Sequence, residues 1–140
     1  FSMAIMGMIF SDLENHNTEK ILKMILLHDL AESITGDMTP EQISKEEKTV
    51  IENNTVKKIL NDLPVSLQKQ YNVLWEEYQS NTSKEAKIVH QIDRLEMALQ
   101  AKIYSNDGYS KEKIDSFFNS AKNEITDPKL LELFKKILER

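Results

Sequence analysis

The sequence predicts an all-α fold, a compact single-domain bundle of about six to seven helices. Only three glycines and three prolines occur in 140 residues, whereas strand-rich folds need turn residues about every ten positions. Apolar residues recur three and four positions apart in successive segments, which is the spacing of one helix face. Hydrophobic residues make up 40% of the chain, enough for one buried core. With no internal repeat or linker, we expect one domain over residues 1–140.

The first two predicted helices are apolar. Residues 1–10 are interpreted as the remainder of a core helix that starts upstream of this sequence. Thr18 is a candidate cap for a second helix over about residues 19–34. Its apolar residues recur at helical spacing: Ile21, Leu22, Ile25 and Leu26. A glycine and a proline follow, so a loop is expected over about residues 35–43.

Capping signals predict the next three helices. Ser44 and Glu47 have the spacing of a capping box at the start of a charged helix. Pro64 suits the first turn of the helix after it. Thr82 and Glu85 form a second candidate capping box. The helix that follows has a regular apolar stripe: Ile88, Ile92, Leu95, Leu99 and Ile103.

Two more helices are predicted in the C-terminal part. The turn residues Asn106, Asp107 and Gly108 end the preceding helix. One helix then covers about residues 110–123, and another begins near Pro128 and ends near residue 138. The last helix is amphipathic, and we expect it to pack on the bundle.

Charge and composition narrow the function classes. The formal net charge is −5, with acidic and basic residues mixed, so we expect no binding to nucleic acid or to an anionic membrane. The absence of cysteine excludes disulfides and thiol chemistry and is typical of an intracellular, cytoplasmic enzyme. The apolar residues 1–10 are too few to span a bilayer.

The segment HDLAESITGD, from His28 to Asp37, places ionisable side chains on a predicted buried helix. His28 and Glu32 continue its apolar stripe, with Asp29 beside it, because residues three or four apart share a helix face. Burying a carboxylate without a partner is costly. A divalent cation is an economical partner for an imidazole beside carboxylates. A core histidine hydrogen-bonded to a carboxylate fits the same pattern, so both interpretations stay open.

Asp93, in the segment QIDRLE, borders the apolar stripe of a later helix. Alone it is equally explained by an ordinary salt bridge. Together with the pair His28 and Asp29, it resembles the H…HD…D signature of the HD domain superfamily. The segments HDLAESITGDMTP, ISKEEK, LWEEY and KIVHQIDRLEMALQA are similar to the HD domain-containing protein 2 group, which includes YfbR-like 5′-nucleotidases that act on deoxynucleoside monophosphates. The match runs from about Met3 to about Tyr104.

The resemblance implies roles for five ionisable residues of these segments. Three residues match three of the four ligands of a divalent metal (Mn²⁺, Co²⁺, Mg²⁺ or another such ion): His28, Asp29 and Asp93. Glu32 matches the catalytic acid, and in its acidic surroundings we expect a raised pKa and protonation of the leaving oxygen. Asp37, with the backbone carbonyl of Met38, matches a position near the substrate phosphate or a second metal site shared with Glu32.

One feature of the family signature is missing. Its first histidine would lie about two residues before Phe1 and is absent from this sequence. The upstream segment, which in relatives supplies an arginine for the substrate phosphate, is absent as well. His90 is a poor substitute because it lies about 60° round the helix from Asp93, and His16 lies in a polar loop. We therefore expect an HD domain that is incomplete at its N-terminus, with metal weakly bound, missing, or completed by water or another molecule.

The resemblance implies a metal-dependent phosphohydrolase that removes the 5′-phosphate from (deoxy)nucleoside 5′-monophosphates, acting as a homodimer. Two alternatives stay open. One is an HD phosphodiesterase of a cyclic or signalling nucleotide, although the extra ligands of a binuclear site are not found. The other is an inactive helical module that binds a nucleotide or a protein. The aromatic residues Tyr71, Trp75 and Tyr78 are interpreted as core or dimer contacts rather than a base-stacking platform.

Overall fold

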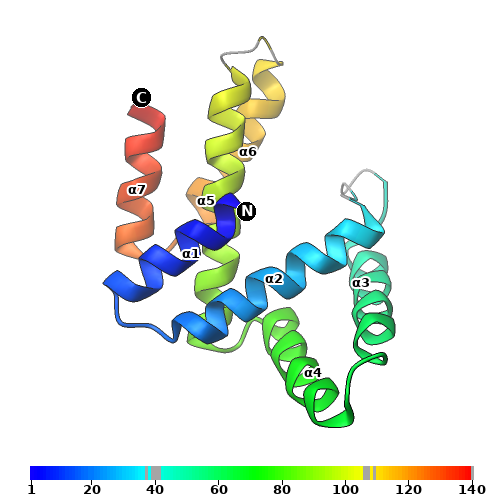
Figure 1. Cartoon of the computed structure of the whole chain (residues 1–140). Helices are drawn as coiled ribbons and strands as arrows, with labels where there is room; N and C mark the ends of the chain where they lie inside the picture. Colours follow the sequence, from blue (N-terminus) through cyan, green and yellow to red (C-terminus); the bar gives the residue numbers. More distant parts are fainter. Residues whose placement is uncertain (37, 39–41, 106–107, 109, 140) are drawn as a thin grey trace.

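The computed structural model describes residues 1–140 except for residues 37, 39–41, 106, 107, 109 and 140. The described residues form seven α-helices and no strand (Figure 1). Their bounds are α1 Ser2–Leu13, α2 Thr18–Thr35, α3 Lys45–Leu60, α4 Val65–Ser80, α5 Lys84–Ser105, α6 Lys111–Glu124 and α7 Pro128–Glu139. None of them, over this part of the chain, is long and apolar enough to cross a membrane. The predicted all-α fold is confirmed.

Helices α2 and α5 connect the two sides of the molecule. Helix α5 is 22 residues long and packs against α1, α2, α4, α6 and α7. Helix α2 packs against α1, α3, α4 and α5. Figure 1 shows α6 and α7 beside α5 on one side, with α3 and α4 at the other side below α2. The two helices that carry the predicted metal ligands are therefore in direct contact.

The core-facing side of α5 differs in part from the predicted stripe. Ile88, Ile92 and Leu95 are buried as expected, and full burial of such a side chain stabilises the fold by about 1.5–3 kcal/mol. Leu99 is only half-buried, and Ile103 is 47% exposed. The buried positions in this half of the helix are instead two alanines, Ala98 and Ala101. Small side chains at this contact allow the neighbouring helices to approach α5 closely.

Helices α1 and α2 cross at Gly7. A Cβ atom at this position would lie only 2.4 Å from Cδ1 of Ile25, which is fully buried. The absence of a side chain therefore allows the close approach of the two helices. The side chain of Leu26, one of the apolar residues that recur at helical spacing in α2, is 57% exposed. The crossing brings the first turn of α1 next to α2 and α5.

One of the predicted helix caps is present in the structure, and at two other helices the neighbouring residue is the cap. The capping box that begins at Ser44 is present at α3. At α2 the side chain that caps the helix is Asn17, and Thr18 is the first helical residue. At α5 the hydroxyl of Ser83, rather than that of Thr82, accepts a hydrogen bond from the backbone N–H of Ala86. Neighbouring candidates compete for these positions, and asparagine and serine are better N-caps than threonine.

Candidate metal centre

A pocket of about 350 Å³ opens where the start of α1 meets α2 and α5. Its wall brings together the predicted ligands from two helices: His28 and Asp29 from α2, and Asp93 from α5. Glu32 from α2 also lines it. The remaining lining residues are Phe1, Ser2, Met3 and Glu96. Residues that are 65 positions apart in sequence (28 and 93) therefore share one small pocket.

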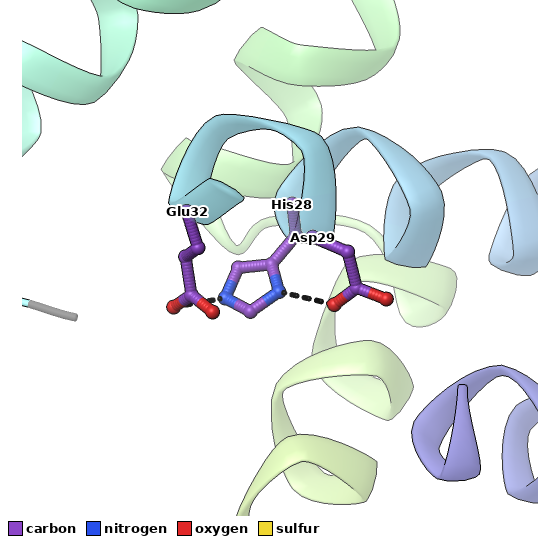
Figure 2. A group of neighbouring side chains, drawn as sticks. All are labelled: His28, Asp29 and Glu32. Atoms are coloured by element: carbon purple, nitrogen blue, oxygen red, sulfur yellow. Dashed lines mark hydrogen bonds and ion pairs between the residues drawn. The ribbon is translucent and has the colours of Figure 1, made fainter. Parts of the chain in front are cut away.

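The α2 side of the pocket forms a tight polar group of three side chains (Figure 2). Nε2 of His28 lies 3.0 Å from Oε1 of Glu32, and Nδ1 of His28 lies 3.4 Å from Oδ1 of Asp29. His28 and Glu32 meet because residues four apart are adjacent on a helix face. One ligand atom from each of the three residues lies within 4.8 Å of the others. This spacing is compatible with one shared cation.

The imidazole of His28 carries the positive charge that this acidic group requires. Burial on its own would lower the pKa of His28, but the hydrogen bonds to Asp29 and Glu32 and the nearby charge of Asp93 outweigh it and raise the pKa to about 10. The ring is buried, with 8% of the residue exposed. At neutral pH a protonated His28 therefore offsets part of the negative charge in the pocket.

The structure corrects the expected pKa of Glu32. Its hydrogen bond to His28 lowers the pKa of Glu32, and this effect exceeds the opposing effect of burial. The sequence had predicted a raised pKa because it showed an acidic cluster but not the direct contact with an imidazolium. Glu32 is therefore ionised at neutral pH and is a proton acceptor in this arrangement.

Asp93 faces the group from α5. Burial raises the pKa of Asp93, although the charges of His28 and Arg94 act in the opposite direction. Asp93 lines the same pocket as His28, but it is not part of the tight group on α2. It supplies a carboxylate to the pocket from a second helix.

Of the two loop residues predicted near the substrate, the structure describes one. Asp37 lies outside the described residues. Met38 is half-buried in the segment after α2, which ends at Thr35. The predicted roles of both residues in metal or phosphate binding remain predictions.

The other two histidines make contacts elsewhere. The ring of His90 is stacked on Tyr78, with ring centroids 4.4 Å apart, and its Nε2 lies 2.9 Å from the Tyr78 carbonyl oxygen. The ring of His16 lies against Phe10, 5.7 Å between centroids. Neither residue lines the pocket.

Glu96 is a pocket residue whose role the sequence did not decide. It follows Asp93 by one helical turn, and its Oε1 accepts hydrogen bonds from the hydroxyl of Ser2 and from the side-chain amide of Gln100. The bond from Ser2 connects the first turn of α1 to α5. Glu96 therefore holds the wall of the pocket that α1 provides.

The donor set suits a divalent ion. One imidazole nitrogen and several carboxylate oxygens are ligands that Mn²⁺, Co²⁺, Zn²⁺ and related ions accept, whereas Cu(I) and other soft ions favour sulfur. His28, Asp29 and Glu32 already place three such donors in mutual reach. Asp93 adds a fourth donor, a carboxylate oxygen, from α5.

Comparison with known proteins identifies the family of the chain. A family model described as HD domain matches residues 1–133. The chain belongs to the HD domain family. As an HD domain, it is 36% identical over 138 residues to 5′-deoxynucleotidase HDDC2 of Homo sapiens, covering 98% of this chain and 67% of that protein.

Two further relatives of this HD domain come from other lineages. The 5′-deoxynucleotidase HDDC2 of Dictyostelium discoideum is 38% identical over 148 residues, which cover 98% of this chain and 76% of the relative. The 5′-deoxynucleotidase YBR242W of Saccharomyces cerevisiae is 34% identical over 136 residues, covering 91% of this chain and 55% of the relative. The predicted family is therefore confirmed.

Proposed function

We propose that this HD domain is a metal-dependent phosphohydrolase that removes the 5′-phosphate from deoxynucleoside 5′-monophosphates. The observation that carries the proposal is the convergence of His28, Asp29, Glu32 and Asp93 on one pocket. The names of the relatives, 5′-deoxynucleotidases from several eukaryotes, support the reaction and the substrate class.

His28, Asp29 and Asp93 would hold the divalent cation. When bound, such an ion lowers the pKa of a coordinated water and neutralises charge on the phosphoryl group. His28 must give up its proton to become a ligand, so the same residue is either the internal cation of the pocket or a metal ligand. Asp37 and Met38 would contribute near the phosphate, as the resemblance implies.

Glu32 would transfer the proton from the attacking water to the leaving group. In the proposed reaction a water oxygen attacks phosphorus while the bond between phosphorus and the 5′-oxygen breaks. Glu32, as a carboxylate, accepts one proton from the attacking water and returns it to the departing 5′-oxygen. The products are the deoxynucleoside and hydrogen phosphate. The lowered pKa of Glu32 means that it is ionised at neutral pH before the cation displaces the proton of His28, so it enters this cycle as a carboxylate.

Phosphate release is the direct test. The chain is incubated with dAMP, AMP and a nucleotide diester, each with Mn²⁺, Co²⁺ or Mg²⁺ and each with EDTA. Cation-dependent release from dAMP that exceeds release from AMP supports the proposal. Hydrolysis of the diester alone indicates the phosphodiesterase alternative, and no hydrolysis with any cation indicates a binding module.

The proton role of Glu32 has its own test. Glu32→Gln keeps the size of the side chain but cannot accept a proton, so kcat on dAMP should fall by about 100-fold or more. Glu46→Gln, an exposed change on α3, is the matched control and should leave kcat unchanged. Equal kcat in wild type and Glu32→Gln would remove Glu32 from the mechanism.

Three other expectations from the sequence remain predictions. We infer a homodimer, a cytoplasmic location and no affinity for nucleic acid. Light scattering of the purified chain measures the first, and an electrophoretic shift with duplex DNA measures the last. The mixed charge of the chain supports the last expectation.

A further inference from the structure

The ring of His28 has a neighbour outside the acidic pocket. The aromatic ring of Tyr78, from α4, lies 5.5 Å from the His28 ring between centroids, with an angle of 60° between the ring planes. Tyr78 is buried, with 6% of the residue exposed. The imidazole is therefore held by carboxylates at its two nitrogens and by an aromatic ring beside it.

Tyr78 is itself fixed by His90 on α5. The two rings are stacked, 4.4 Å apart between centroids and within 4° of parallel, and Nε2 of His90 lies 2.9 Å from the Tyr78 carbonyl oxygen. His90 thus contacts both the side chain and the backbone of Tyr78. Trp75 packs against the same ring at 5.4 Å, and its indole N–H donates to Oδ1 of Asn53 on α3 at 2.7 Å. The position of the tyrosine ring is set by three helices.

The carboxylates alone do not fix His28 once a cation binds. Asp29 and Glu32, which face the two ring nitrogens, both belong to the candidate metal group. Their oxygens would turn toward the cation and leave the imidazole. The contact with Tyr78 involves no ligand atom, so it persists with or without a cation. Metal sites depend on such supporting contacts, because they orient the ligands.

We propose that Tyr78 is a positioning residue for His28, with His90 as its support. This inference rests on the proposed function, because it assigns His28 to the cation. The ring of Tyr78 is the part that matters: among the described residues, no hydrogen bond to its hydroxyl is formed. The phenylalanine variant therefore keeps the contact, and the leucine variant removes it.

The test compares Tyr78→Phe and Tyr78→Leu in the full chain by two readouts that do not need the reaction. The first is Mn²⁺ affinity, measured from the electron paramagnetic resonance signal of the free ion. The second is NMR of the protein with EDTA, which reports the ring-current shift of the His28 ring protons and their nuclear Overhauser effects to Glu32. Ile114→Ala, a buried change on α6, is the control for general loss of stability.

Tyr78→Phe should bind Mn²⁺ within about threefold of wild type, whereas Tyr78→Leu should bind about 10–100-fold more weakly. Tyr78→Leu should also lose the ring-current shift and the contacts between His28 and Glu32. Ile114→Ala should change neither readout. Unchanged His28 contacts in Tyr78→Leu overturn the inference, and so does an equal loss of affinity in both Tyr78 variants. If wild type binds no Mn²⁺, the proposed function fails, and the NMR comparison still decides the role of Tyr78.

Discussion

Two pockets among the described residues differ in size and in charge balance. The larger, about 540 Å³, lies between the start of α2 and α4, and two of its three lysines pair with carboxylates. Nζ of Lys20 lies 2.6 Å from Glu77, and Nζ of Lys23 lies 2.6 Å from Glu19. The smaller, about 350 Å³, has four carboxylates and one imidazole in its wall. Of the two, the smaller pocket is the one with an excess of acidic side chains.

The comparison teaches that charge balance identifies a site better than volume does. Salt bridges close to the surface satisfy one another and contribute little, so the larger pocket needs no ligand to be stable. Carboxylates gathered in a small pocket repel one another and lose hydration, so they require a cation. The protonated His28 meets part of this requirement within the protein itself.

The largest effect is expected from Asp93→Ala. It removes the predicted ligand that α5 contributes to the pocket, so Mn²⁺ affinity should fall by at least about 100-fold, with phosphate release lost at the same cation concentration. Calorimetric titration with Mn²⁺ measures the first effect, and a phosphate assay the second. Asp115→Asn, an exposed change on α6, is the control. Undiminished Mn²⁺ binding by Asp93→Ala would contradict the assignment.

The fold was predictable because it depends on patterns that are local in sequence. Helical spacing and capping signals located all seven helices, including the capping box at Ser44. Exact caps were less predictable, because Asn17 and Thr18 are adjacent and both can cap a helix. The buried side of α5 was harder still. Which of Leu99 and Ala98 faces the core depends on how closely other helices approach, and that distance is a tertiary property.

The candidate site was predictable in its members but not in its electrostatics. The grouping of His28 with Asp93 followed from the motif, and the structure places both in one pocket. The pKa of Glu32 was predicted in the wrong direction, because its sign depends on a 3.0 Å contact that spacing suggests but does not specify. The contact between Tyr78 and His28 joins α4 to α2. The spacing of LWEEY indicated a buried aromatic face, but not which residue it would meet.

A smaller effect is expected in the larger pocket. Lys20→Met removes the ion pairs with Glu77 and Glu85, at 2.6 and 3.7 Å, while keeping an unbranched apolar side chain. Because these groups are near the surface, the free energy of unfolding should fall by at most about 1 kcal/mol. Denaturant unfolding measures this change. Mn²⁺ affinity and phosphate release should stay at wild-type values, and a large loss of either would mean that the larger pocket takes part in function.

The smallest effect is expected in the pH dependence of stability, through His90. Burial lowers the pKa of His90 below its usual 6.5, against the opposing effects of the Tyr78 carbonyl and Asp93; His28 and Arg94 add to the lowering. The folded protein therefore gains stability from His90 that is fully present above pH 6.5 and is lost as the pH falls through the lowered pKa.

His90→Phe keeps an aromatic ring against Tyr78 but cannot be protonated. The wild type should therefore lose more unfolding free energy than the variant between about pH 7.5 and pH 5. Denaturant unfolding in EDTA at several pH values measures the difference, and contributions from His28 are common to both proteins. If the unfolding free energies of the two proteins changed in parallel with pH, protonation of His90 would not destabilise the fold. No histidine occurs among the described residues that line the larger pocket, so changes there should not alter this profile.

The crossing at Gly7 has a consequence for how finely the pocket can be adjusted. Ser2, which lines the pocket, lies five residues before Gly7, or about 7.5 Å along the helix axis. A rotation of α1 by about 10° around the crossing would then displace Ser2 by roughly 1 Å, which is comparable to the tolerance of a metal site. A bulkier side chain at Gly7 would push against Ile25 and cause such a rotation. Turnover could thus be altered from a position that touches neither substrate nor ion.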